Sequence, residues 1–110
     1  MPYILPKHRK NLDGFIDQLA DAIVSEAAEY SDPGAFAGLL NYTCTCLALR
    51  VVRRRCGQMR YWLIALLTGV FKNMADEFYR RVGAPYENRQ IAKNGDVPLF
   101  QEYLKEIEKM

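Results

Sequence analysis

A helical repeat is clearest in residues 12–30, which read LDGFIDQLADAIVSEAAEY. Apolar side chains recur there at intervals of three and four, at Leu12, Phe15, Ile16, Leu19, Ile23, Ala27 and Tyr30. This spacing places them on one face of an α-helix and leaves the carboxylates of Asp13, Asp17 and Asp21 on other faces. Asn11 is a favourable N-cap and Asp13 suits the first turn, so we predict that the helix begins there.

Turn residues predict where the second helix begins and ends. The stretch Ser31-Asp32-Pro33-Gly34 interrupts the repeat, with Asp32 as the cap and Pro33 as the first residue of a new helix. We expect this helix to run to about Arg55, because the dipeptide Cys56-Gly57 follows.

The remaining chain predicts more helices and no strand. A third helix is expected over residues 59–82, closed by Gly83 and Pro85, with one or two further turns over 86–93. After the turn Asn94-Gly95-Asp96, a short amphipathic helix from Pro98 is expected to dock back on the bundle. The sequence therefore predicts an all-α fold, a compact bundle of four to five helices.

Length and composition indicate one globular domain over residues 1–110. Half of the residues are apolar and a quarter are charged, which excludes a disordered or collagen-like chain. Fifteen basic and thirteen acidic residues give a net charge of +2, too small to indicate a nucleic-acid or membrane partner.

The second and third helices each carry two apolar faces. A helical wheel groups Phe36, Leu40, Thr43, Leu47 and Val51 apart from Leu39, Tyr42, Cys46 and Leu49, and it groups Ile64, Leu67, Phe71, Ala75, Phe78 and Val82 apart from Trp62, Leu63, Leu66 and Val70. Such helices need burial nearly all round, which one small subunit hardly supplies. Inside the subunit the two helices are expected to pack closely along their small residues, which are Ala37, Gly38, Asn41, Thr45, Ala48, Ala65 and Gly69. The faces with Tyr42, Cys46 and Leu49 and with Trp62, Leu66 and Val70 then still need cover, so we predict a homo-oligomer, a dimer first.

A group of polar residues forms the candidate polar pocket or interface: Asn41, Thr45, Asn73, Glu77, Arg81 and Tyr86. Glu77 and Arg81 have the spacing of an i,i+4 ion pair. The group is interpreted either as a hydrogen-bonded helix contact that fixes register, or as a small pocket with Tyr79, Arg80 and Tyr86 at its rim.

A candidate basic patch is formed by Arg50, Arg53, Arg54 and Arg55. Cations at the C-terminal end of a helix are favoured by its macrodipole, and the acidic first helix offers partners. Contact with nucleic-acid phosphates is the alternative.

Candidates for catalysis are few, and no catalytic residue is assigned. The single histidine, His8, lies in a charged terminal segment, and no glycine-rich phosphate loop is present. The pairs Glu26/Glu29 and Asp76/Glu77 suggest the helix-borne acidic pairs that bind Mg²⁺ in nucleotide pyrophosphohydrolases of the MazG type. The second pair lacks the one-turn ExxD spacing, so a non-enzymatic protein is the first expectation.

The cysteines Cys44, Cys46 and Cys56 lack the spacing and histidine partners of a zinc site, so they are expected to be free thiols and no metal or cofactor is predicted. The N-terminal segment is too short for a signal peptide, and the run Tyr61–Phe71 is about half a membrane span. We expect a cytoplasmic protein without a membrane partner.

Several short motifs follow one another in a characteristic order. They are Met1-Pro2-Tyr3-Ile4, Gly38-x-x-Asn41-Tyr42-x-x-Thr45, Gly69-Val70, Glu77-Phe78-Tyr79-Arg80-Arg81, Ala84-Pro85-Tyr86-Glu87 and Asn94-Gly95-Asp96-Val97. The series resembles a family of small uncharacterised proteins met in prokaryotic and phage genomes. The resemblance implies a single compact domain and no particular activity.

Together these observations predict a self-associating interaction or structural module. The alternatives are a nucleic-acid-binding accessory protein and, behind it, a Mg²⁺-dependent nucleotide pyrophosphohydrolase.

Overall fold

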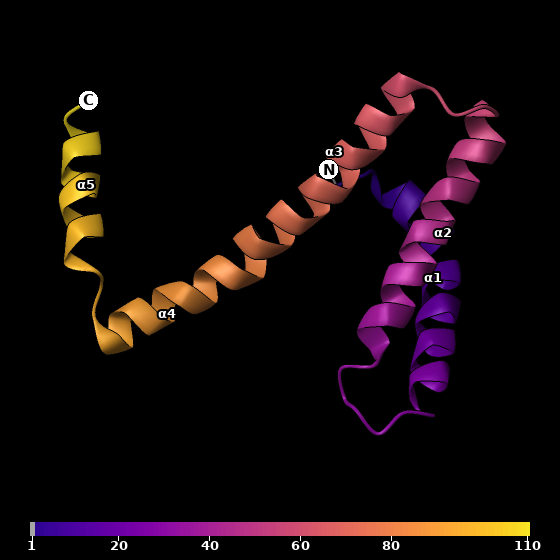
Figure 1. The fold of residues 1–110 in the computed structure, drawn as a ribbon, viewed down its shortest axis with the longest axis horizontal. Coiled ribbons are helices and arrows are strands. Elements are labelled where there is room, and N and C mark those ends of the chain that lie inside the picture. Colours follow the sequence, from indigo (N-terminus) through magenta and orange to yellow (C-terminus); the bar gives the residue numbers. More distant parts are fainter. Residues whose placement is uncertain (1) are drawn as a thin grey trace. The chain divides into compact units, whose positions relative to one another are not determined.

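The computed structural model describes residues 2–110, and this part of the chain consists of helices without any strand (Figure 1). The elements are α1 (Pro6–Ala27), α2 (Phe36–Cys56), α3 (Tyr61–Phe78), a π-helical segment η1 (Tyr79–Gly83), α4 (Ala84–Asn94) and α5 (Pro98–Glu108). The predicted all-α class is confirmed. The chain divides into two compact units, Met1–Val70 and Phe71–Met110, which are described separately, and the prediction of one domain over 1–110 stays a prediction.

Helix α1 begins earlier than predicted. Leu5 precedes it in an extended conformation and Pro6 occupies the first turn, where the missing N–H of proline costs nothing. Asn11 is therefore an interior residue, and the prediction that it caps the helix is wrong. The side chain of Arg9 bonds back to the entering chain, with Nε donating to the carbonyl of Ile4 at 2.9 Å.

The connection between α1 and α2 is longer than predicted, because Asp32 caps a turn and not the helix. The backbone N–H of Gly34 donates to Asp32 Oδ1 at 2.9 Å, and α2 starts only at Phe36. The end of α2 is as predicted: Gly57 has a φ of 77° and its N–H donates to the carbonyl of Arg53 at 3.0 Å.

Helices α1 and α2 pack against each other as an antiparallel hairpin (Figure 1). Leu19 and Ile23 of α1 line a shared groove with Leu39 and Thr43 of α2. The Thr43 hydroxyl donates to the carbonyl of Leu39 at 2.8 Å, so this polar group is satisfied within its own helix. The first unit is therefore organised around helix-on-helix packing.

Burial is confined to the neighbourhood of the turn that joins α2 to α3. Val52 is 8% exposed and Leu63 is 2% exposed, and among residues 2–110 these are the only apolar side chains that are fully buried. Both belong to the first unit. Most of the apolar faces predicted for α2 and α3 are accordingly left open.

Gly83 and Pro85 do not end a helix, contrary to prediction. The chain passes through the wider turn of η1, in which the N–H of Ala84 donates to the carbonyl of Tyr79, and then continues as α4. Pro85 falls in the first turn of α4, where it needs no N–H partner. Gly83 allows the Tyr79 ring to pack closely, since an added Cβ would lie 2.6 Å from Tyr79 Cδ2.

The predicted turn before the last helix is confirmed. Gly95 has a φ of 90°, its N–H donates to Ile91 at 2.8 Å, and α5 begins at Pro98. The docking of α5 on the bundle stays a prediction, and the side chains of the α5 apolar face are 51–62% exposed: Leu99, Phe100, Tyr103, Leu104 and Ile107.

Candidate self-association surface

The stripe of small residues on α2 was expected to pack inside the subunit, but four of its five residues line a shallow, open depression. Its lining is Ala37, Gly38, Asn41, Tyr42 and Thr45, and its volume is about 530 Å³. Inside it the Thr45 hydroxyl donates to Asn41 Oδ1 at 3.4 Å, one helical turn apart. Because the other side chains are small or apolar, a second helix could approach this backbone closely.

A second hollow lies between α1 and α2, with a volume of about 250 Å³. It is apolar apart from Glu26 and the hydroxyl groups of Tyr42 and Thr43. Tyr42 lines both hollows and is itself exposed. This side chain therefore connects the α2 depression with the groove of the hairpin.

The predicted apolar face of α3 is covered only at Leu63. Trp62, Leu66 and Val70 continue that face at intervals of four residues and are 44–56% exposed. On α2 the comparable face has Tyr42 and Leu49 exposed, whereas Leu39 and Cys46 are half-buried. These half-open faces are the largest departure of the first unit from an ordinary core.

The candidate polar pocket is distributed over both units. Asn41 and Thr45 lie on α2 in the first unit, whereas Asn73, Glu77, Arg81 and Tyr86 lie in the second. Within the first unit the structure brings Asn41 and Thr45 together. Within the second, Glu77 pairs with Arg80, with Arg80 Nε donating to Glu77 Oε2 at 3.1 Å.

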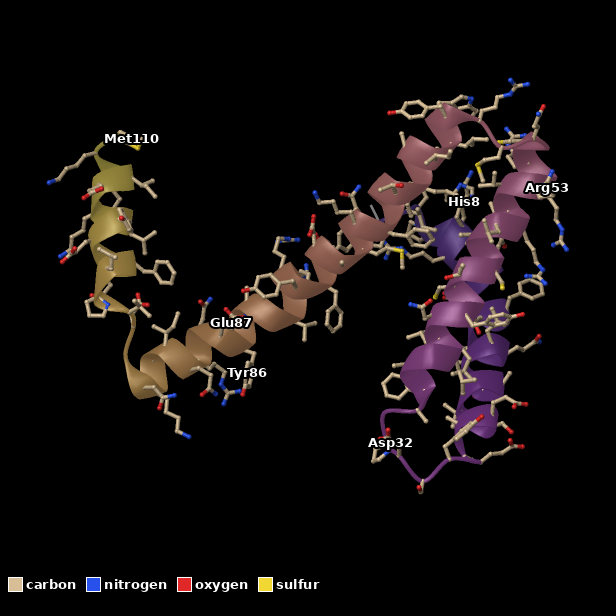
Figure 2. All side chains as sticks on the ribbon, in the orientation of Figure 1. His8, Asp32, Arg53, Tyr86, Glu87 and Met110 are labelled. Carbon is tan, nitrogen blue, oxygen red and sulfur yellow. The ribbon has the colours of Figure 1, made fainter. Side chains whose placement is uncertain are left out.

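The ion pair that the structure gives Glu77 is with Arg80, and the expected Glu77–Arg81 pair stays a prediction. Positions three and four residues apart are both neighbours on a helix surface, and spacing alone does not choose between them. Asn73 and Tyr86 are exposed, Tyr86 in the view of Figure 2 near Glu87.

Sequence reasoning missed the contact between Tyr79 and Glu87. The phenol of Tyr79 donates to Glu87 Oε2 at 2.8 Å across eight residues. This hydrogen bond raises the pKa of Tyr79, and desolvation and the negative charge of Glu87 add to the effect. A pattern search for partners three or four residues apart cannot find it, because the wide turn of η1 lies between the two residues.

The candidate basic patch occupies the last turns of α2. Arg50, Arg53, Arg54 and Arg55 are all exposed, and Arg50 Nη1 donates to the carbonyl of Cys46 at 3.3 Å. The acidic residues of α1 were expected to pair with these arginines. Within residues 2–110 no ion pair joins α1 to these arginines.

One acidic pair considered for Mg²⁺ lies at the end of α1, where the N–H of Glu29 donates to the carbonyl of Glu26 at 3.2 Å, and the other, Asp76 and Glu77, lies in α3. Glu26 lies in the last turn of α1, whereas Glu29 lies beyond its end. Within residues 2–110, no three His, Cys, Asp or Glu side chains gather closely enough to hold a metal ion. The cysteines are free thiols, with Cys44 and Cys46 half-buried and Cys56 exposed. Over the same residues, no helix has the length and apolar character needed to cross a membrane.

Comparison with curated proteins finds no match, and comparison with solved structures finds none. One family model matches residues 1–97 and is described as a domain of unknown function, DUF6899. The matched region contains every motif of the series that starts at Met1-Pro2 and ends at Gly95-Asp96-Val97, and α5 lies outside it. The chain belongs to the DUF6899 family.

Proposed function

We propose that the protein is a self-associating interaction module, in which the open faces of α2 and α3 pair with a second copy. The observation that carries the proposal is the half-exposed stripe Trp62, Leu66 and Val70 on α3. Full burial of such side chains stabilises by about 1.5–3 kcal/mol each as an upper estimate. A monomer that leaves them in water forgoes this gain, and contiguous apolar patches of this kind are typical of association sites.

The shape of α2 supports a close helix contact. The depression from Ala37 to Thr45 has no large side chain except Tyr42 at its edge, so a helix of a second copy can approach its floor. Asn41 and Thr45 supply hydroxyl and amide groups there that can bond across the contact. Two-fold symmetry is the commonest way in which such a surface pairs with itself.

Light scattering coupled to size-exclusion chromatography tests the proposal. At micromolar concentration the wild-type protein is expected to have at least twice the monomer mass of 12.7 kDa. Leu66→Glu places a charge in the middle of the α3 stripe, so it is expected to shift the protein to monomer. Ile91→Glu, at an exposed apolar position of α4, is the matched control and should keep the wild-type mass. A monodisperse wild-type monomer would contradict the proposal.

The other sequence predictions carry less support. Nucleic-acid binding rests on the exposed arginines of α2, and the pyrophosphohydrolase alternative rests on two acidic pairs, of which Asp76 and Glu77 lack the one-turn spacing. The cytoplasmic location and the prokaryotic or phage origin are kept as proposals from the sequence.

A further inference from the structure

Charges in the first unit fall into two separate groups along the chain. The basic residues are Lys7, Arg9, Lys10, Arg50, Arg53, Arg54, Arg55 and Arg60, and the acidic ones are Asp13, Asp17, Asp21, Glu26, Glu29 and Asp32. No Lys or Arg occurs in residues 11–49, and no Asp or Glu occurs in 33–70. The acidic residues thus form one block that lies between two basic ones.

Antiparallel packing turns this order into two charged regions in space. Because residues 19–26 of α1 and 39–43 of α2 line one groove, the same register places the start of α1 level with the end of α2. His8 and Arg53 accordingly lie toward one end of the hairpin, and Asp32 lies at the other (Figure 2). The hairpin has a basic end, formed by Lys7, Arg9, Lys10, Arg50 and Arg53–Arg55.

The carboxylates are also arranged along one line. Asp13, Asp17 and Asp21 are spaced by four residues, so they share one face of α1, and all three are exposed. On a helical wheel this face lies opposite Leu19 and Ile23, the residues that face α2. We call these three residues the acidic stripe.

The helix macrodipole explains the basic residues of α2 but not those of α1. Arg53, Arg54 and Arg55 lie in the last turn of α2, where cations are favoured. Lys7 and Arg9 lie in the first turn of α1, which holds no acidic residue, and cations there oppose the dipole. The cations at the start of α1 are thus unfavourable for their own helix, and they lie beside several arginines of α2. A negatively charged partner would compensate for both effects.

Carboxylates of the same hairpin do not fill that role. Within residues 2–110 the recorded ion pair is Arg80–Glu77, which lies in the second unit. Arg9 and Arg50 bond to backbone carbonyls instead. The basic end and the acidic stripe are therefore both open to a partner of opposite charge.

We propose that two copies associate through their hairpins in antiparallel orientation, with the basic end of each copy against the acidic stripe of the other. This inference rests on the proposed self-association and adds its orientation. A two-fold axis makes the same contact twice, so one hairpin supplies both complementary surfaces. Complementary charges fix register and orientation in such contacts. Val24 is exposed on the same face of α1 as the acidic stripe and supplies apolar burial there.

Nucleic-acid phosphates are the competing partner for the basic end. Phosphates would neutralise the cations of α1 and α2. The acidic stripe, however, would then have no partner and would be repelled by the nearby polyanion. A second copy uses both charged regions and the apolar side chains of the hairpin. We therefore favour the second copy.

A charge-swap experiment on the full chain tests this arrangement. The first variant carries Arg53→Glu, Arg54→Glu and Arg55→Glu, and the second carries Asp13→Lys, Asp17→Lys and Asp21→Lys. Each variant alone places like charges opposite each other across the contact. Its dimer dissociation constant, measured by sedimentation equilibrium, is therefore expected to rise by about tenfold or more. An equimolar mixture restores both contacts and is expected to form a heterodimer at the wild-type concentration range.

A control variant with Lys93→Glu, Lys105→Glu and Lys109→Glu makes the same charge change in the second unit and should associate as the wild type does. Circular dichroism verifies that each variant keeps its helices, and the recovery on mixing shows that each still folds. Wild-type association should also weaken as salt rises.

The possible outcomes separate the two proposals. A monomeric wild type overturns both. A wild-type dimer that neither salt nor the charge changes affect overturns the antiparallel arrangement alone. If the arginine variant dimerises normally but loses the wild-type binding of duplex DNA, the basic end is a phosphate site and the arrangement is likewise overturned. Recovery in the mixture, with both variants weakened alone, supports it.

Discussion

Residues 1–70 and 71–110 are stabilised in different ways. In the first unit α1 packs along α2, and both fully buried apolar side chains, Val52 and Leu63, lie there. In the second unit the recorded side-chain contacts join near neighbours in sequence, such as Glu77 with Arg80 and Tyr79 with Glu87. The first unit therefore depends on packing between helices, and the second depends on contacts along one helical path.

Charge follows the same division. The hairpin separates its basic and acidic residues, whereas both signs are interspersed from Lys72 to Lys109. Interspersed charges can form ion pairs along their own helix. Separated charges instead favour one orientation of a charged partner over the others. The surface that can orient a charged partner therefore lies on the first unit.

Helix length adds to this contrast. Helix α5 has 11 residues, and isolated helices below about 12–15 residues are only marginally stable in water. The exposed face of α5 lacks the apolar cover that usually stabilises such a helix.

The largest expected effect concerns the buried corner of the first unit. Leu63→Ala removes a side chain that is 2% exposed, and such changes cost about 2–5 kcal/mol of unfolding free energy. Leu104→Ala on α5 removes the same atoms from a side chain that is 55% exposed and should change stability by about 0.5 kcal/mol or less. Urea denaturation below the dimer dissociation concentration measures both. Equal losses would show that the contrast between the two regions is wrong.

The fold class and several helix ends could be predicted because their signals are local. Gly57 and Gly95 adopt positive φ values at the ends of α2 and α4, and Pro98 starts α5, as the residue types indicate. The spacing of apolar residues identified every long helix. Such features depend on a few neighbouring residues, so no tertiary information is needed.

Competition between two local signals, and tertiary context, explain the errors. Pro6 and Asn11 are both good starting residues, and the chain uses the earlier one. Gly83 and Pro85 are normally helix terminators, but a single π turn allows the helical path to continue through them. The exposure of the α5 face could not be predicted, since periodicity shows that a face exists and not what covers it.

The candidate surface could likewise be predicted only where it depends on residues of a single helix. Four of the five small residues of α2 that the sequence singled out line one depression, because their spacing fixes a common face, whereas Ala48 is not part of its lining. The basic end of the hairpin could not be recognised from the arginine run, since three of its seven residues, Lys7, Arg9 and Lys10, come from another helix. Only the packing of α1 on α2 brings the two parts to one end.

A smaller effect is expected from the two glycines that sit in contrasting surroundings. A Cβ at Gly14 in α1 meets nothing within 4 Å, so Gly14→Ala should stabilise by about 0.5–1 kcal/mol through better helix propensity. A Cβ at Gly83 would lie 2.6 Å from the ring of Tyr79, so Gly83→Ala should lose that gain and displace the ring. Urea denaturation of both variants measures the difference. Equal stabilisation by both would contradict the packing at η1.

The smallest expected effect is the titration of Tyr79, which tests whether local contacts in the second unit persist in solution. Its hydrogen bond to Glu87 first, then desolvation and the Glu87 charge, raise the pKa of the phenol above 10.0. A raised pKa in the folded state means that the contact contributes its full stability below the unfolded pKa and loses it as pH rises through the folded pKa. Glu87→Gln removes the charge and weakens the acceptor, so it should lower the pKa of Tyr79.

Ultraviolet absorbance of tyrosinate follows this titration, and the difference between the wild type and Tyr79→Phe isolates one phenol among the seven tyrosines. Gly83→Ala should also lower the pKa of Tyr79, because a displaced ring no longer reaches Glu87 Oε2. Glu102→Gln on α5 is the control, since Glu102 takes no part in this contact. A Tyr79 titration that is identical in the wild type and in Glu87→Gln would show that the hydrogen bond does not persist. The second unit would then lack the longest-range of its recorded side-chain contacts, and its helices would depend on their local sequence alone.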